Sequence, residues 1–184
     1  AHELERWSLQ RAQRLGDRRR GHLEPALHFL LHDLAPHRQP VVVHYGSFEH
    51  GAIWEETIDV SIVANASRCV WRCDAARAQP RPDRYLAVRS PARAFPANRM
   101  FFAAIKDLAR VAVEPKVRVT AVNAHELRVH VEAPAYLYFF HVLLPDERAA
   151  LSDNYFDLAA GESADVIITS PTPLQPETLT FHWR

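Results

Sequence analysis

Hydrophobic and polar residues alternate with a period of two through much of the C-terminal half of the chain. The clearest example is the pair of segments 116–122 and 126–132, which are joined by the turn residues Asn123 and Ala124. Successive side chains of a β-strand point to opposite faces, so this alternation gives each segment one apolar and one polar face. The two segments therefore predict a β-hairpin.

Further strands are expected before and after this hairpin. Residues 136–144 are almost entirely apolar, which is typical of a strand covered on both faces. The remaining segments with strand-like composition are 41–45, 57–63, 69–72, 85–88, 165–169 and 179–183. Short strands at a spacing of about ten residues, with turn residues between them, predict a β-sandwich.

The N-terminal segment follows a helical period instead. Four leucines recur with the i, i+3, i+4, i+7 spacing of one helix face: Leu27, Leu30, Leu31 and Leu34. Pro25 is suited to the first turn of a helix, and Pro36 would stop the helix. These residues predict a helix at about 25–34.

The composition narrows the function classes. The chain has 184 residues, a hydrophobic content of 48% and a formal net charge of zero. It can bury a core, but its charge offers no general attraction for nucleic acid or an anionic membrane. No apolar run approaches the length of about 18 residues that a membrane-spanning helix needs. We therefore expect neither nucleic acid nor a membrane as a partner, while the compartment stays open.

Two cysteines, Cys69 and Cys73, lie four positions apart. In a strand they would share a face and lie about 13 Å apart, which is too far for a disulfide. We interpret them as two free thiols that are buried or half-buried.

Histidine is abundant, with eleven residues in the chain, and two of them suggest a metal site. His28 and His32 are four positions apart, so a helix would place both imidazoles on one face. The segment lacks the glutamate that follows the first histidine in helical metalloprotease motifs, and no third ligand is evident. We interpret the residues as a helix-surface pair and predict no metal and no cofactor. A zinc-dependent enzyme is the alternative, which stoichiometric zinc would establish.

Residues 152–162 carry the most specific motif: a polar turn, an aromatic and apolar stretch, and a second turn at Gly161. This string resembles the SDNYFDLxxGE segment in the last β-sandwich domain of family 2 glycoside hydrolases of the β-mannosidase and exo-β-glucosaminidase type. Weaker similarities occur in the order of that family at residues 5–15, 25–43, 65–74 and 98–115. Together they cover most of the chain.

The resemblance implies a mostly β protein with three parts. Residues 1–38 would be a helical segment resembling the end of a catalytic barrel, 39–97 an abbreviated β-sandwich-like region, and 98–184 a C-terminal immunoglobulin-like β-sandwich. The middle part is called abbreviated because a complete immunoglobulin-like sandwich needs about 100 residues. The last strand of the barrel, which the family has between the positions of Arg20 and Pro25, has no counterpart here.

The same resemblance implies that this chain is not the catalytic part of such an enzyme. The acid/base glutamate of the family lies in an Asn-Glu dipeptide, which this chain lacks, and the barrel strand of the nucleophile has no counterpart either. We therefore expect a non-catalytic accessory region of a β-mannosidase-like hydrolase. It would buttress the catalytic barrel of the same parent polypeptide or its substrate cleft. Whether the chain belongs to an active enzyme stays open, and alone it is predicted to be inactive.

The candidate catalytic residues support that expectation. Glycoside hydrolysis usually needs two carboxylates at a separation of about 5–5.5 Å or about 6.5–9.5 Å. Glu55 and Glu56 are adjacent, and neighbours on a strand point to opposite faces. We interpret Asp153 and Asp157 as turn-capping residues. The sequence also lacks a serine in a G-x-S-x-G elbow.

Aromatic side chains offer the remaining candidate site, because an exposed ring can stack on a sugar. Trp54 follows Gly51 in what we expect to be an exposed turn, and it is the candidate sugar-contact residue. Trp71 and Trp183 lie in predicted strands and are expected in the core. The alternative function is a free-standing carbohydrate-binding or adhesion-type β-sandwich module, with carbohydrate as its partner.

Overall fold

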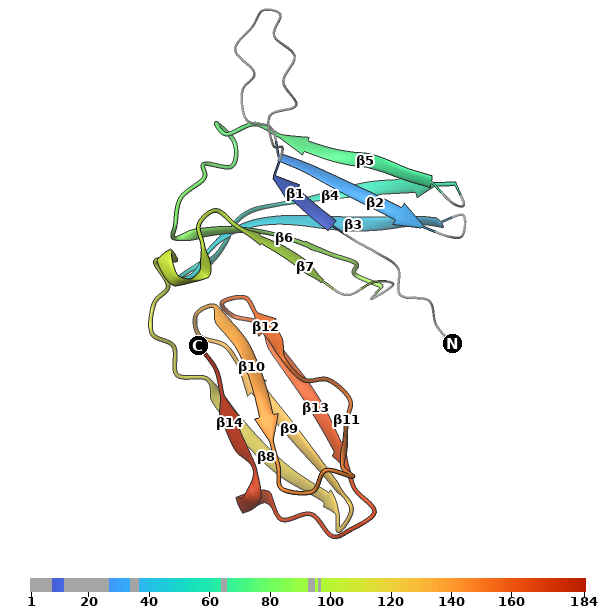
Figure 1. Cartoon of the computed structure of the whole chain (residues 1–184), viewed down its shortest axis with the longest axis vertical. Helices are drawn as coiled ribbons and strands as arrows, with labels where there is room; N and C mark the ends of the chain where they lie inside the picture. Colours follow the sequence, from blue (N-terminus) through green and yellow to red (C-terminus); the bar gives the residue numbers. More distant parts are fainter. Residues whose placement is uncertain (1–7, 12–26, 34–36, 64–65, 93–94, 96) are drawn as a thin grey trace, which may run out of the picture. The chain divides into compact units, whose positions relative to one another are not determined.

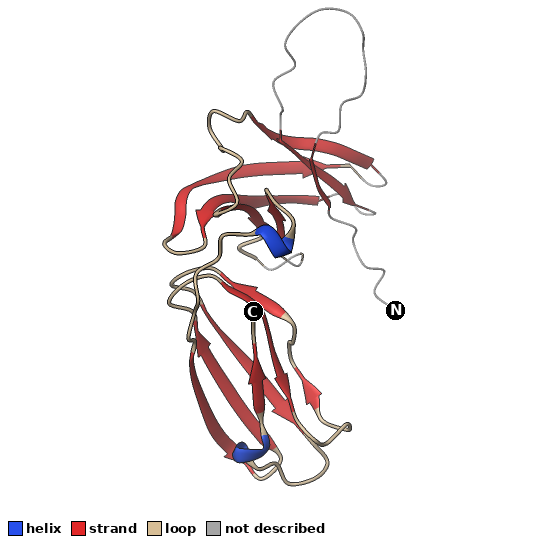
Figure 2. Ribbon diagram, turned by 60° about the vertical axis from the view of Figure 1, so that its left-hand side comes forward, coloured by secondary structure: helices blue, strands red, loops and turns tan. Residues whose placement is uncertain are grey.

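The computed structural model describes residues 8–11, 27–33, 37–63, 66–92, 95 and 97–184, most of which form β-strands (Figure 1). Within these residues, helical structure is confined to two 3₁₀ turns, η1 (Ile105–Asp107) and η2 (Pro176–Thr178), drawn in blue in Figure 2. The predicted mostly β fold class is confirmed.

The chain divides into two compact units. Unit 1 consists of Ala1–Ser47 and Ala52–Ala109, and unit 2 consists of Phe48–Gly51 and Arg110–Arg184. Each unit has two sheets and its own hydrophobic core.

Unit 1 pairs a four-stranded sheet with a three-stranded one. The larger sheet has the order β4 (Gly51–Ile62), β3 (His37–Ser47), β6 (Arg84–Arg89), β7 (Asn98–Phe101). The smaller sheet has the order β1 (Ser8–Arg11), β2 (Leu27–Asp33), β5 (Ala66–Cys73). The core joins Val43, Tyr45 and Leu86 of the larger sheet to Trp71 of the smaller one.

The helix predicted at about 25–34 is wrong where the structure describes it, because Leu27–Asp33 is strand β2. This strand pairs antiparallel with β1 on one side and with β5 on the other. A short apolar run does not distinguish helix from strand, so pairing with neighbouring strands outweighs the leucine spacing. The remainder of the predicted helical segment 1–38, at 1–7, 12–26 and 34–36, lies outside the described residues.

Strands β1 and β2, which precede the expected region 39–97, belong to the same unit as most of that region. They form one sheet with β5, so this sheet joins residues of the expected segment 1–38 to residues of the expected region 39–97. At the other end, β7 pairs with β6, so unit 1 continues past residue 98, where the third part was expected to begin.

Unit 2 contains the predicted hairpin. β8 (Lys116–Asn123) and β9 (Glu126–Glu132) pair antiparallel, from Lys116 opposite Glu132 to Asn123 opposite Glu126. Their sheet has the order β11 (Ala150–Leu151), β13 (Ser163–Thr169), β9, β8. The second sheet has the order β12 (Phe156–Leu158), β10 (Leu137–Leu143), β14 (Thr180–His182).

Period-two alternation places the core of unit 2. In β9, Leu127, Val129 and Val131 are completely buried, while the residues between them face away. Phe140 and Val142 of β10 meet them from the other sheet in one hydrophobic cluster. Burying a side chain of this kind contributes about 1.5–3 kcal/mol, so this cluster is a main source of the stability of unit 2.

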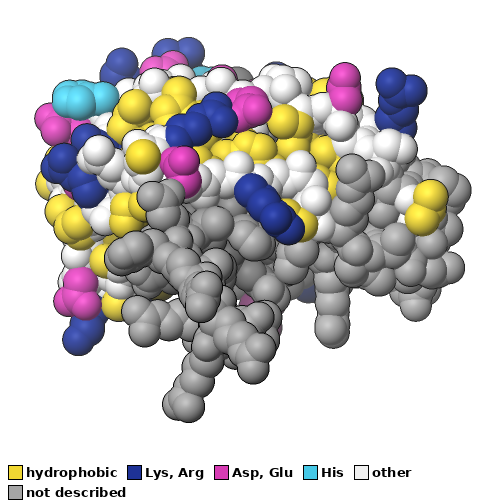
Figure 3. Space-filling model, turned by 90° about the horizontal axis from the view of Figure 1, so that it is seen from above, with side chains coloured by type: hydrophobic (Ala, Val, Ile, Leu, Met, Phe, Trp, Pro, Cys, Tyr) yellow, Lys and Arg dark blue, Asp and Glu magenta, His cyan; other side chains and the backbone are white. Residues whose placement is uncertain are grey.

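The surface carries charges of both signs. On the face shown in Figure 3, Lys and Arg side chains lie among Asp and Glu side chains and hydrophobic ones. This mixture is consistent with the formal net charge of zero. In the part of the chain that the structure describes, no helix is long and apolar enough to cross a membrane.

Candidate functional site

The adjacent glutamates of β4 have separate surroundings, as strand geometry predicts. Glu55 Oε1 lies 3.0 Å from His44 Nδ1. Glu56 Oε2 accepts a hydrogen bond from Trp71 Nε1 at 3.3 Å and forms an ion pair with Arg77 at 2.7 Å. The two carboxylates therefore do not converge on one substrate in the way that glycoside cleavage requires.

His44 joins three strands of unit 1 through a polar chain. Its Nδ1 faces Glu55, and its Nε2 lies 2.9 Å from the Tyr85 hydroxyl. A proton on Nδ1 satisfies both contacts, because Nε2 then accepts from the tyrosine. The hydrogen bond from His44 lowers the pKa of the Glu55 carboxyl. His44 and Tyr85 are only 6% and 1% exposed, whereas the Glu55 side chain is 42% exposed and also accepts a hydrogen bond from Arg89 at 3.0 Å. The chain of contacts therefore runs from the core of the sheet to its surface and ties β3, β4 and β6 together.

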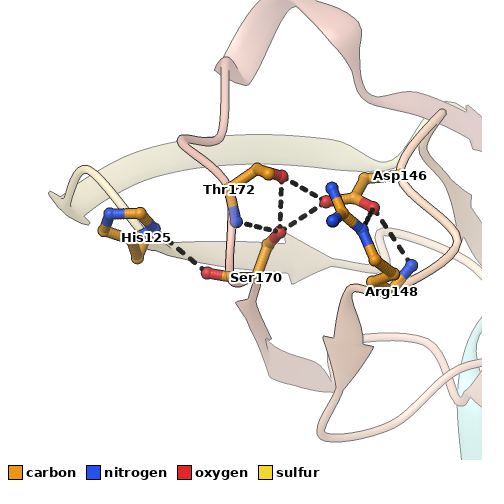
Figure 4. A network of polar contacts seen from close by, with 5 residues as sticks. All are labelled: His125, Asp146, Arg148, Ser170 and Thr172. Carbon is orange, nitrogen blue, oxygen red and sulfur yellow. Dashed lines mark hydrogen bonds and ion pairs between the residues drawn. The ribbon is translucent and has the colours of Figure 1, made fainter.

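A polar network in unit 2 surrounds Asp146 (Figure 4). Its Oδ2 accepts hydrogen bonds from the hydroxyls of Ser170, at 2.5 Å, and of Thr172. Its Oδ1 accepts from the backbone N–H and from Nε of Arg148, each at 3.1 Å. These donors, led by the Ser170 hydroxyl, hold the pKa of Asp146 well below its usual range. The ionised carboxylate thus ties the loop after β10 to the end of β13.

This network lacks the contact that a serine hydrolase needs. His125 Nδ1 lies 3.1 Å from the backbone carbonyl of Ser170, whereas the Ser170 hydroxyl donates to Asp146 (Figure 4). In a catalytic triad, the histidine must reach the serine hydroxyl to take its proton. His125, Arg148 and Ser170 do line an open hollow. Their contacts fix the loops, and the Ser170 hydroxyl bonds to a carboxylate and not to His125.

The histidine pair considered as a metal site falls on strand β2 and not on a helix. His28 is opposite Arg72 and His32 is opposite Ser67 in the pairing with β5. Four positions along a strand span about 13 Å, in contrast to the single helical turn that the sequence predicted. Among the residues that the structure describes, no three His, Cys, Asp or Glu side chains gather closely enough to hold a metal ion.

Both cysteines are free, as predicted: Cys69 is half-buried and Cys73 is buried. Burial raises the pKa of the Cys73 thiol. Because the thiolate is the reactive form, Cys73 is protected from oxidation and alkylation.

Trp54 was the candidate sugar contact, and the structure places it differently from the expected exposed turn. The turn ends at His50, and Gly51, with φ of 74°, begins strand β4. The half-buried indole stacks on Tyr45 with ring centroids 5.5 Å apart, and the Arg77 guanidinium lies 4.6 Å from its centre. Trp54 Nε1 donates to the Arg77 carbonyl at 3.1 Å. The expected turn is therefore wrong, while a sugar contact at Trp54 stays a prediction.

The motif at 152–162 acts as a hydrogen-bonding clamp. Asn154 Oδ1 accepts from the backbone N–H of Val142 at 2.9 Å, and its Nδ2 donates to the Val142 carbonyl at 3.1 Å. Asp153 Oδ1 accepts from the Asn154 N–H at 2.8 Å, which is a turn contact of the expected kind. The next residue, Tyr155, has φ of 62°, in the left-handed region that aromatic residues rarely adopt.

Asp157 completes the clamp. Its Oδ2 accepts from the Tyr136 hydroxyl at 2.7 Å, and its Oδ1 accepts from the backbone N–H of Phe139 at 2.8 Å. Phe139 has φ of 57° and lies where the pairing of β10 with β12 shifts register. A left-handed backbone at a residue other than glycine costs about 1–3 kcal/mol, which the hydrogen bonds from Asp157 help to offset. These contacts agree with a structural role for Asp157.

The clamp presents two aromatic rings to solvent. Phe139 is 36% exposed and Tyr155 is 53% exposed, with ring centroids 5.3 Å apart. His141 stacks on Tyr155 at 4.9 Å and lies 5.3 Å from His182 of β14. We name these four residues the aromatic face. Sequence reasoning missed this feature because residues 136–144 were expected to be covered on both faces. That expectation is wrong for Phe139 and Leu143, which are exposed.

The chain thus consists of two successive units that each contain two β-sheets, and the second unit carries the clamp and the aromatic face. Residues 112–181 match the family model Ig_mannosidase, which describes an Ig-fold domain. The match confirms the resemblance drawn from the sequence for the last β-sandwich, and residues 112–181 of unit 2 form an Ig-fold domain. No curated protein matches the chain.

A solved structure resembles nearly the whole chain. The β-D-mannosidase from Dictyoglomus thermophilum matches 96% of this chain with a TM-score of 0.70 and a sequence identity of 14%. At this identity the likeness concerns the fold alone. The match occupies 21% of that β-mannosidase, so the chain corresponds to about a fifth of its length.

Proposed function

We propose that the chain is a non-catalytic accessory region of a family 2 glycoside hydrolase of the β-mannosidase type. In this role it buttresses the catalytic barrel of the same polypeptide or borders the substrate cleft of that barrel. The observation that carries the proposal is the Ig_mannosidase match at residues 112–181. The fold likeness to 21% of a β-mannosidase supports it, because a region of that size would be one part of a larger enzyme.

The contacts of the candidate carboxylates support the non-catalytic part of the proposal. Glu55 is held by His44, and Asp146 by hydroxyl groups and Arg148. Asp157 accepts hydrogen bonds from Phe139 and from a tyrosine hydroxyl. Each of these carboxylates joins segments of its own unit.

A hydrolysis assay tests this part directly. The purified chain should release no aryl alcohol from an aryl β-mannoside or an aryl β-glucosaminide above the buffer blank. Hydrolysis at more than a trace rate that follows the chain through every purification step would contradict the proposal. A Glu55→Gln variant would then show whether the activity belongs to this chain or to a contaminant.

The buttressing part has its own test. The DNA directly upstream of the region that encodes this chain should encode a catalytic barrel in the same reading frame. In the resulting polypeptide, removal of residues 110–184 should lower the melting temperature of the barrel. A frame without a barrel, or a barrel whose melting temperature is unchanged by the deletion, would contradict a buttressing role.

A further inference from the structure

The outer face of β10 is rich in apolar and aromatic side chains. Three alternate residues of this strand point away from the core: Phe139, His141 and Leu143. β10 lies between β12 and β14 (Figure 1), and Tyr155 and His182 add two rings to the same surface. Large exposed apolar side chains in one place are characteristic of a binding surface.

Two residues of this surface have a backbone conformation that is rare for residues other than glycine. Phe139 and Tyr155 both have left-handed φ, of 57° and 62°. Asp157 accepts from the Phe139 N–H at 2.8 Å, and Asn154 accepts from the Tyr155 N–H at 3.2 Å. These bonds use backbone atoms, so glycine could make them too and would adopt the same φ without strain. The local fold therefore does not require rings here, which points to a role for the rings themselves.

Polar groups border the rings. His141 Nδ1 lies 3.0 Å from the Phe139 carbonyl, so a proton on Nδ1 leaves Nε2 as an acceptor. His182 and the Tyr155 hydroxyl provide further donors and acceptors at the same surface. The negative face of an aromatic ring attracts the C–H groups on one side of a pyranose, and the polar groups can bind its hydroxyls.

We propose that the aromatic face, Phe139, His141, Tyr155 and His182, binds a pyranose residue of an oligosaccharide. A standard protein interface covers about 800 Å² on each partner, whereas this face consists of a few side chains with polar groups among them, which suits a small polar ligand. The inference does not rest on the proposed function, because a sugar can bind this surface whether or not a catalytic barrel accompanies the chain. Hydrolysis and binding are therefore tested separately.

Titration with mannotriose and with cellotriose tests the inference. Isothermal calorimetry should detect saturable binding of at least one trisaccharide to the full chain. In a ¹⁵N-labelled sample, the largest chemical-shift changes should occur at residues 139, 141, 155 and 182. Val122→Ala should leave the affinity unchanged, since Val122 is an exposed apolar residue of β8 in the other sheet of unit 2.

Glycine substitutions separate binding from folding. Phe139→Gly and Tyr155→Gly each remove a ring, and glycine adopts the left-handed backbone without strain, so both variants should remain folded, as circular dichroism would show. Their affinity for the trisaccharide should fall at least tenfold. His182→Ala should also weaken binding, because it removes a polar group from the face.

Three results would overturn the inference. The first is no saturable binding of either trisaccharide. The second is binding that both glycine variants retain. The third is self-association of the chain, without sugar binding, that the glycine variants abolish, since this would make the face a protein contact.

Discussion

Trp54 of unit 1 and the rings of Phe139 and Tyr155 of unit 2 are held in opposite ways. Trp54 of unit 1 is half-buried against Tyr45 and Arg77, and its indole N–H is satisfied by a backbone carbonyl. Phe139 and Tyr155 of unit 2 are held toward solvent on a left-handed backbone. The first arrangement strengthens the sheet that carries it, whereas the second costs backbone energy and exposes apolar surface.

The difference shows which rings are available to a ligand. A side chain that packs on its own sheet has given most of its surface to folding. Phe139 and Tyr155 remain 36% and 53% exposed although their backbone conformation costs free energy, so part of each ring stays available to a ligand. Exposure and backbone conformation, more than residue type, therefore identify the binding candidate.

The largest effect is expected from a methyl group added among the packed rings of unit 1. A Cβ at Gly46 would lie 2.5 Å from His44 Nε2 and 2.7 Å from the ring and hydroxyl of Tyr85. Gly46→Ala should therefore lower the free energy of unfolding by about 3 kcal/mol, measured by urea denaturation. The matched control is Gly161→Ala in unit 2, where nothing lies within 4 Å and only the φ of 83° opposes the change. Its expected loss is about 1 kcal/mol, and equal losses at both sites would contradict the account.

Truncation of Trp54 should have the next largest effect. Trp54→Ala removes a half-buried ring and its hydrogen bond, so we expect a loss of about 2 kcal/mol in the free energy of unfolding. Trp54→Phe keeps a ring at this position and should lose less than half as much. If Trp54→Ala left the free energy of unfolding unchanged but abolished sugar binding, Trp54 would be the binding residue and its structural role would be contradicted.

Acid should weaken both units through carboxylates that are held ionised. The pKa of Glu55 is lowered from its usual 4.5 by His44, and the pKa of Asp146 is lowered from its usual 3.8 by Ser170 and Thr172. A lowered folded-state pKa gives stability that is present above the usual value and is lost as the pH falls toward the folded one. Stability should therefore decline below about pH 4.5 for Glu55 and below about pH 3.8 for Asp146.

Two variants assign this acid dependence to its residues. Glu55→Gln and Asp146→Asn should each be less stable at neutral pH and show a shallower decline in acid, followed by urea denaturation at several pH values. A decline in acid that keeps its full slope in both variants would rule out these two carboxylates as its source.

The sequence was most informative where local pattern and tertiary structure agree. The hairpin at 116–122 and 126–132 follows directly from period-two alternation, and β8 and β9 confirm it. The segment 27–33 misled because its leucine spacing suits a helix, whereas pairing with β1 and β5 decides the structure. A local sequence pattern contains little information about strands that pair from distant parts of the chain.

The candidate site was harder to predict for the same reason. Asp153 and Asp157 could be interpreted as structural because short acidic side chains favour turns. The left-handed φ of Phe139 is supported by a hydrogen bond to Asp157, which is eighteen positions away. The residues next to Phe139 in the sequence therefore do not predict this conformation. Trp54 was misplaced because Gly51 was taken as part of a longer turn, although it begins a strand.

The clamp of unit 2 holds Phe139 in a left-handed backbone conformation, and its ring is not needed for that conformation. Thermal unfolding of Phe139→Gly and Phe139→Ala tests it most directly, because the two variants lose the same ring and differ in their tolerance of positive φ. The free energy of unfolding should be about 1 kcal/mol larger for Phe139→Gly than for Phe139→Ala. An alanine variant at least as stable as the glycine variant would contradict it.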